Sequence, residues 1–187
     1  MLTNSPSTAP AVQYVALANG SLAGCTTRAT FSAWINPTTN TTIAPVLEFG
    51  YDSTHYTNVT TYVGGSSPGS ALSFYFINGT GSSFVVTQKL SYASGWTHIA
   101  VVRGDDPANG VGRDAALYVN GGLQASTNNT KRGANFWDAT TSTTTSNFLG
   151  KSQVATTPGF NGAIDEVLVS CRAYTADEIQ QLAYLPP

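Results

Sequence analysis

Charge is the scarcest property of this 187-residue sequence. Only 10% of its residues are Asp, Glu, Lys or Arg, whereas an average soluble domain has about 25%. The formal net charge is −2, and no basic patch is available to neutralise phosphates, which argues against a nucleic-acid partner. Thr, Ser, Asn and Gly take the place of the missing charges. A polar but uncharged surface of this kind favours a setting outside the cytosol.

Long apolar runs are also absent. No stretch of about 20 apolar residues is present to span a membrane, so we expect no membrane insertion. The first 17 residues, MLTNSPSTAPAVQYVAL, show neither the basic region nor the apolar region of a signal peptide. We therefore expect either a leader that has been removed or a route without one, as for a virus particle assembled inside a cell.

Cysteine is limited to Cys25 and Cys171, whose spacing does not match a metal site. From the residues alone, the two either pair or remain separate buried thiols. Five sequons for N-glycosylation favour a secretory route, although a chain rich in Asn and Thr also produces sequons by chance. Their acceptors are Asn19, Asn40, Asn58, Asn78 and Asn128.

Short segments of alternating polarity, separated by turns, fill most of the chain. In TFSAWIN, for example, Phe31, Ala33 and Ile35 share one face and Ser32 and Trp34 the other. The Asn120-Gly121 step is a strong hairpin signal. Ten to twelve strands with turns between them predict an all-β, antiparallel two-sheet sandwich. We expect strands at 11–17, 30–36, 43–51, 56–63, 71–77, 83–88, 96–103, 115–121 and 146–150, before the closing segment.

The closing segment, FNGAIDEVLVSCRAYTADEI at 160–179, reads as a strand followed by a helix start. Thr175 and Glu178 have the spacing of a capping box, in which each side chain bonds the other residue's backbone N–H. Apolar residues then recur at helical spacing. We predict one short C-terminal helix of about two turns, packed on the sandwich through Ile179, Leu182 and Ala183.

Five motifs occur in the order of a known family. They are Tyr14-Val15-Ala16-Leu17, FSAWINP, WTHIAVVR, Leu117 to Gly121 (LYVNG), and the closing FNGAIDEVLV with its acidic-capped helix. Together they cover nearly the whole chain, which resembles the laminin-G-like or concanavalin-A-like jelly roll, a group that includes the pentraxins. The resemblance implies one domain over residues 1–187. It also implies two facing antiparallel sheets, with the first and last strands as neighbours.

Neighbouring first and last strands would bring Cys25 and Cys171 close enough for a disulfide. The resemblance also implies a Ca²⁺ site, because many relatives bind calcium with the closing-strand aspartate, here Asp165, and with oxygens of the N-terminal segment. Relatives often carry an acid just before the YV pair, where this chain has Gln13. By strand alternation Asp165 shares a face with the apolar Val167 and Val169, so a local hydrogen bond is the alternative to a metal.

Two polar segments carry aromatic residues that are candidates for ligand binding. Trp34 and Trp96 lie in core motifs of the family, whereas Trp137 lies in the polar segment GANFWDATT. The second segment, YDSTHY, contributes Tyr51, Asp52, His55 and Tyr56. Exposed aromatic rings stack on sugar faces and are enriched at interfaces. The alternative is that each aromatic packs on its own sandwich.

Catalytic patterns are weak. Residues 65–69 match G-x-S-x-G, but strands flank them on both sides and Pro68 lacks the N–H of an oxyanion hole. Glycosidases of the same broad fold cluster carboxylates in an E-x-D-x-E-like run, which the only glutamates, Glu48, Glu166 and Glu178, do not form. His55 and His98 have no obvious acidic partner nearby in the sequence, and His98, inside a predicted strand, is interpreted as structural. We therefore expect no enzyme, although convergent sites from distant loops stay open.

These observations predict a non-enzymatic recognition or adhesion module on an extracellular, cell or particle surface. Its partner is a glycan or a protein, bound through loops at one rim of the sandwich. The alternative is a structural coat, fibre or capsid-associated protein whose partners are neighbouring subunits. A glycoside hydrolase is the third hypothesis. The fold alone does not choose among them, because this sandwich hosts many functions.

Overall fold

Eleven strands and one helix form in the part of the chain that the computed structural model describes. That part is residues 1, 13–22, 24–25, 28–38, 43–52, 54–62, 71–78, 82–89, 95–104, 115–127 and 145–185. The elements are β1 (Val15–Ala16), β2 (Ala29–Pro37), β3 (Ala44–Asp52), β4 (His55–Tyr62), β5 (Ala71–Asn78), β6 (Ser82–Lys89), β7 (Thr97–Arg103), β8 (Ala115–Val119), β9 (Gly122–Thr127), β10 (Ser146–Leu149), β11 (Gly162–Ser170) and α1 (Ala176–Ala183).

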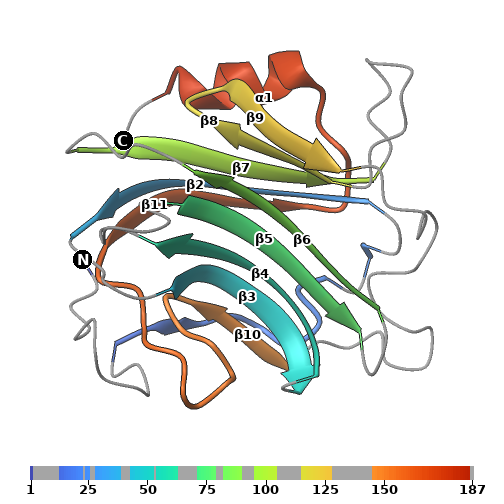
Figure 1. Cartoon of the computed structure of the whole chain (residues 1–187), viewed down its shortest axis with the longest axis vertical. Helices are drawn as coiled ribbons and strands as arrows, with labels where there is room; N and C mark the ends of the chain where they lie inside the picture. Colours follow the sequence, from blue (N-terminus) through green and yellow to red (C-terminus); the bar gives the residue numbers. More distant parts are fainter. Residues whose placement is uncertain are drawn as a thin grey trace.

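The strands form two facing antiparallel sheets, as predicted. One has six strands in the order β1-β10-β3-β4-β5-β6, and the other has five in the order β11-β2-β7-β8-β9. Figure 1 shows the two sheets as layers, with α1 covering the outer face of the five-stranded sheet near β7, β8 and β9. The six-stranded sheet therefore has an outer face on the opposite side of the molecule from α1. In the described part of the chain, no helix is long and apolar enough to cross a membrane.

Alternation of side chains builds the core between the sheets. Phe31 and Ile35 of β2 and Phe49 of β3 are almost completely buried, and the rings of Phe31 and Phe49 stack with their centroids 5.5 Å apart. Phe74 of β5 lies against the same cluster, 6.3 Å from Phe31. Burying a large aromatic or aliphatic side chain contributes roughly 1.5–3 kcal/mol, so these inward positions hold the two sheets together.

The ends of the chain meet differently from the expectation. The first strand, β1, pairs with β10 in the six-stranded sheet, whereas the last strand, β11, pairs with β2 in the other sheet. The prediction that the first and last strands are neighbours is therefore wrong for β1. The neighbour of β11 is β2, the strand that follows Cys25. Both strands are nine residues long, so they pair along most of their length.

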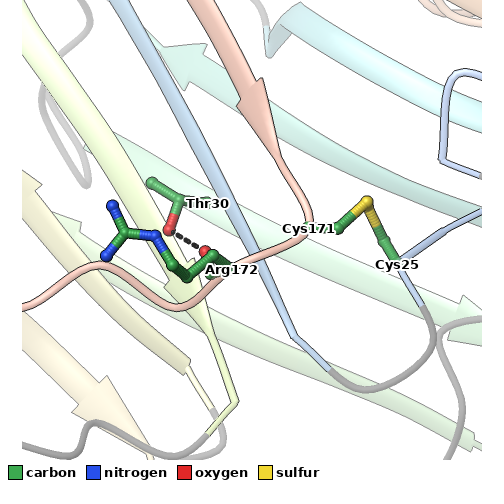
Figure 2. The surroundings of a disulfide bond; sticks show 4 residues. All are labelled: Cys25, Thr30, Cys171 and Arg172. Atoms are coloured by element: carbon green, nitrogen blue, oxygen red, sulfur yellow. Dashed lines mark hydrogen bonds between the residues drawn. A yellow bond between two sulfur atoms is a disulfide. The ribbon is translucent and has the colours of Figure 1, made fainter.

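A disulfide joins Cys25, just before β2, to Cys171, just after β11 (Figure 2). Of the two alternatives for the cysteines, the structure has the bridge, and it closes a sequence separation of 146 residues. Beside it the Thr30 hydroxyl donates to the Arg172 carbonyl oxygen at 2.7 Å (Figure 2). The Tyr174 N–H donates to the same hydroxyl at 3.0 Å. The bridge and these bonds fix the chain where it leaves β11.

The hairpin between β8 and β9 turns at Asn120-Gly121, as the sequence predicts. Both residues have positive φ, 47° and 78°, which a two-residue type I′ turn requires and which Asn and Gly tolerate best. Gly121 is also needed for space, because an added Cβ would lie 3.1 Å from the Gln180 Cα of α1. The turn therefore packs closely against α1.

The capping box of α1 forms as predicted. The Thr175 hydroxyl accepts from the Glu178 N–H, and the Glu178 carboxylate accepts from the Thr175 N–H at 2.8 Å. The helix buries Ile179 against Ala100, Val102 and Tyr118 on the outer face of the five-stranded sheet. A helix of eight residues is too short to be stable alone, so this packing holds it.

Candidate functional site

The β3–β4 hairpin brings three of the predicted ligand-binding residues together. The Tyr51 and His55 rings stack with centroids 4.6 Å apart, and His55 Nδ1 lies 2.9 Å from an Asp52 carboxylate oxygen. The Thr54 N–H and hydroxyl both donate to that oxygen at 2.7 Å. Tyr51, Asp52 and His55 thus form an aromatic and acidic cluster at one end of the six-stranded sheet, and the expectation that His55 has no acidic partner is wrong.

Asp52 is held in its ionised form. Burial acts to raise its pKa, but the hydrogen bonds from Thr54 and His55 outweigh it and lower the pKa to about 2. An ionised carboxylate only accepts hydrogen bonds, and the Asp52 side chain is 45% exposed. It is therefore available to accept from hydroxyl groups outside the protein.

Tyr56 lies on the outer face of the six-stranded sheet rather than in the hairpin cluster. It pairs with Gly50 of β3, whereas Asn58, two residues further along β4, pairs with Glu48 of β3 and Tyr75 of β5. Burial raises the pKa of Tyr56, and electrostatic interaction with Glu48, followed by that with Tyr75, raises it further. The phenol therefore stays neutral and both donates and accepts. Tyr56 and Tyr75 are both half-buried.

Glu48 is the buried centre of this outer face, a role that sequence reasoning missed. One carboxylate oxygen accepts from the Gln153 N–H at 2.6 Å and from the Ser152 hydroxyl at 3.1 Å. The other accepts from Asn58 Nδ2 at 3.0 Å. Burial raises the pKa of Glu48, and these three hydrogen bonds oppose the rise. The signal in the sequence was a lone glutamate within the apolar strand IAPVLEFGY.

The segment after β10 lies over the same face. The Val154 N–H donates to the Ser152 hydroxyl at 3.0 Å, so the bonds to Glu48 fix this segment on the sheet. The Gln153 side chain lies above Gly50, where an added Cβ would also approach the His55 carbonyl oxygen at 2.6 Å. A glycine at this point is what lets the glutamine side chain approach the strand.

Polar atoms on this face have no partner among the described residues. They are the Asn58 Oδ1, the Gln153 Oε1 and the Gln153 Nε2. Leaving buried polar atoms unpaired costs free energy, roughly 1–3 kcal/mol for each group. Because these atoms are buried, they belong to the polar layer beneath the face and are not themselves contact points for a ligand.

An aromatic and basic cluster flanks the face at its β1–β10 edge. Phe148 of β10 pairs with Glu48, and the Tyr14 ring packs edge-on against Phe148 with centroids 5.6 Å apart. The Lys151 ammonium lies 4.2 Å from the centre of the Tyr14 ring. Tyr14 is 41% exposed. We call Tyr56, Tyr75, Asn58, Gln153 and this edge cluster the polar-aromatic face.

Asp165 does not lie on an apolar face, contrary to the expectation. The register places Asp165 opposite Trp34 and Leu168 opposite Ser32, so β11 has a bulge at Glu166 and Val167. The extra residue reverses the alternation, and Asp165 falls on the outer face, where it is exposed. Its side chain accepts from the Glu166 N–H at 2.9 Å. This is the local hydrogen bond that the sequence offered as the alternative to a metal.

Around Asp165 the described residues show a local hydrogen bond and no cluster of metal-ligating side chains. Nowhere in the described ranges do three or more His, Cys, Asp or Glu side chains gather as metal ligands would. Calcium requires six to eight oxygens, and the one Asp165 oxygen with a partner is used by Glu166. The calcium site stays a prediction, and no step of the function below depends on it.

The remaining candidate residues divide into three groups. Trp137 and the sequon residues Asn40 and Asn128 lie outside the described residues. Asn19 is exposed, and Asn78 ends β5. Asn58 is 8% exposed and bonded to Glu48, so the folded sandwich has no room for a glycan on it.

Two predicted structural residues have different outcomes. His98 is buried and hydrogen-bonds Ser32, as a structural histidine does. Trp96 is 39% exposed, so its expected place in the core is wrong. It precedes the first residue of β7, where the alternation that directs side chains inward has not yet begun.

A family model matches residues 10–180, and its description is the concanavalin A-like lectin/glucanases superfamily. The chain belongs to the concanavalin A-like lectin/glucanase superfamily. The five motifs that suggested this family lie within or beside the strands they were expected to form. No curated protein matches the chain in sequence.

Solved structures share the fold of this superfamily member at low identity. The CBM40 of a Ruminococcus gnavus sialidase, bound to α2,3-sialyllactose, has a TM-score of 0.70 and 15% identity over 91% of this chain and 96% of that one. Domain 4 of an extracellular arabinanase from Geobacillus stearothermophilus, in complex with arabinotriose, has 0.61 and 20%, over 91% and 72%. A heptameric pentraxin from Limulus polyphemus has 0.62 and 15%, over 92% and 73%.

Proposed function

We propose that this protein is a non-enzymatic glycan-binding module, and that the polar-aromatic face of its six-stranded sheet is the binding site. The observation that carries the proposal is that half-buried Tyr56 and Tyr75 lie on one face of the sheet, next to the hairpin that holds the 45% exposed carboxylate of Asp52. Sugars offer apolar ring faces and rows of hydroxyls, and both kinds of group are matched here.

The solved structures with the same fold support a glycan over other ligands. One of them holds sialyllactose and another arabinotriose. Because their identity to this chain is 15% and 20%, they support the class of ligand and leave the sugar itself open. The uncharged character of the chain also suits a neutral, hydroxyl-rich partner.

The arrangement around Glu48 supports binding rather than hydrolysis. Glycoside hydrolases use two carboxyl groups on either side of the scissile bond, roughly 5–10 Å apart. Glu48 is completely buried and accepts three hydrogen bonds from Asn58, Ser152 and Gln153. A carboxylate used in this way holds a loop in place and is closed to a substrate.

An extracellular or surface location is part of the proposal. A disulfide persists in oxidising compartments, and the Cys25–Cys171 bridge is therefore in keeping with secretion or display. The alternative role, as a subunit of a coat or fibre, stays a prediction. Light scattering on the purified protein separates the two, because a coat or fibre subunit forms large assemblies and a recognition module need not.

Replacing Tyr56 by Ala is expected to weaken glycan binding by roughly tenfold to a hundredfold, since it removes a central aromatic contact. A glycan array that includes sialyllactose and arabino-oligosaccharides identifies the ligand, and titration calorimetry measures the change. Tyr184→Ala is the matched control, because Tyr184 is 72% exposed at the end of α1 on the other layer. Equal losses in both variants, or none in Tyr56→Ala, would contradict the proposed site.

Calcium is tested separately by thermal melts in EDTA and in millimolar calcium, because a ligand of the folded state raises the midpoint by mass action. A raised midpoint in wild type that is lost in Asp165→Asn would establish the site. Equal midpoints of wild type in EDTA and in calcium would contradict the predicted calcium site. The array is run under both conditions, so that glycan binding is measured with and without the ion.

A further inference from the structure

A pocket of about 180 Å³ lies on the outer face of the five-stranded sheet, on the opposite layer from the polar-aromatic face. It is bounded by the sheet, the bulge of β11 and the end of α1. The sheet contributes Ser32, Trp34 and His98, and the other walls are Glu166, Val167, Leu168, Leu182 and Leu185. For comparison, an engineered apolar cavity of about 150 Å³ holds benzene.

Two nitrogens of the residues that line this pocket have no partner among the described residues. They are Trp34 Nε1 and His98 Nδ1, and their side chains are 8% and 1% exposed. The other ring nitrogen of His98 lies 2.8 Å from the Ser32 hydroxyl. Nearly all buried polar groups in proteins are paired, so two unpaired nitrogens on residues that line one pocket leave an unmet hydrogen-bonding requirement in its wall.

The bulge that forms one wall has an unusual backbone. Glu166 has a φ of 47° although it is not glycine, and it lies with Val167 where β11 departs from its partner. Bulges redirect side chains and are frequent near binding sites, where such backbone strain is retained. Without the bulge, Val167 and Leu168 would not both border the pocket.

The lining residues define the chemistry of the ligand. Trp34 Nε1 only donates, whereas His98 Nδ1 donates or accepts according to its tautomer. Burial lowers the pKa of His98 to about 4, so the ring is neutral at pH 7. The exposed Glu166 carboxylate disfavours an anion, and the leucines and Val167 favour aliphatic carbon. An amide or a hydroxyl supplies the required acceptor and, where needed, a donor.

We propose that this pocket is a second binding site, for a small uncharged aliphatic molecule that carries an amide or hydroxyl group. The site is independent of the glycan-binding function, because it lies on the other sheet and shares no residue with the polar-aromatic face. Its polar end pairs with Trp34 and His98, and its aliphatic end packs against Leu182, Leu185 and Val167.

The test uses isovaleramide and isovalerate, which have nearly the same shape but differ in charge. The three tryptophans give three indole N–H signals in a nitrogen-15 NMR spectrum, and Trp34→Phe assigns one of them. We expect isovaleramide to shift the Trp34 signal saturably, with a roughly millimolar Kd for so small a ligand. Isovalerate is expected to bind at least about tenfold more weakly, because Glu166 repels it.

Two variants and a matched control decide the assignment. Trp34→Phe removes the donor and is expected to weaken isovaleramide binding about tenfold, followed through backbone signals of β2. Trp96→Phe makes the same replacement at an exposed residue outside the pocket and is expected to leave Kd unchanged. Val167→Phe fills the pocket from its exposed side and is expected to abolish binding in a folded protein.

Three results would overturn the proposal. They are the absence of a saturable shift up to about 100 mM, a range far above the expected Kd, equal binding of amide and carboxylate, and retained binding in Val167→Phe. If Trp34→Phe fails to fold, Val167→Phe alone decides, since it leaves the buried tryptophan in place.

Discussion

Replacing Cys25 and Cys171 by Ala is expected to lower the free energy of unfolding by about 4 kcal/mol. The bridge closes 146 residues of sequence, and the chain-entropy model gives about 5 kcal/mol for a loop of that length, with typical measured values of about 2–4. For a domain of this size the change corresponds to a decrease in Tm of roughly 10 °C. Guanidinium titrations of wild type and double variant measure it.

The chain offers an internal control for this experiment, because these are its only two cysteines. Dithiothreitol is expected to lower the stability of wild type to that of the double variant and to leave the variant unchanged. The fold should survive, since Thr30 still bonds Arg172 and Tyr174 on the closing segment. Equal stability of wild type with and without reductant would show that the bridge contributes nothing.

Replacing Glu48 by Ala is expected to lower the free energy of unfolding by about 3 kcal/mol. The change leaves the Asn58 amide and the Gln153 N–H without their acceptor, and it creates a cavity beneath the segment that carries Ser152. Glu48→Gln keeps the volume but places an amide N–H₂ against one of these donors, so about 1–3 kcal/mol is expected. Urea titrations measure both, and unchanged stability in Glu48→Ala would contradict the account.

The pH dependence of stability gives the Glu48 prediction a second readout. Because burial raises its pKa above 4.5 in the folded state, Glu48 binds its proton more tightly there than in the unfolded chain. Its contribution is therefore fully present below about pH 4.5 and is lost as pH rises through the raised pKa. The stability difference between wild type and Glu48→Gln should fall over this window.

The contribution of Asp52 to stability changes with pH in the opposite direction. Its folded pKa is lowered from 3.8 to about 2, so its contribution is present above the unfolded pKa and is lost as pH falls toward 2. Comparing wild type with Glu48→Gln removes the Asp52 contribution, which both proteins share. A stability difference that rises with pH would mean that the folded state prefers the Glu48 carboxylate to the protonated acid.

Local signals predicted most of the fold. The alternation in TFSAWIN placed Phe31 and Trp34 on opposite faces of one strand, and the structure agrees, with Phe31 in the core and Trp34 lining a pocket on the outer face. Asn120-Gly121 and the pair Thr175 and Glu178 predicted a hairpin and a helix cap, because each needs only neighbouring residues. The choice of partner for β1 was missed, since two residues carry no pattern that selects a sheet.

The candidate site was predicted less completely, for physical reasons. Tyr51, Asp52 and His55 lie within one hairpin, so sequence proximity sufficed to group them. Glu48 and Gln153 are 105 residues apart, and only the folding of the later segment over the sheet brings them together. The bulge at Glu166 was invisible as well, because an inserted residue changes the register and leaves the composition of the strand unremarkable.

The most direct test of the proposed function is to map where on the protein a glycan binds. Backbone NMR signals of the labelled protein should be followed while the best sugar from the array is titrated. The account predicts saturable shifts centred on Tyr56, Asn58, Tyr75 and Gln153, with none at the α1 layer. Absence of any glycan ligand, or shifts confined to the five-stranded sheet, would contradict the central claim.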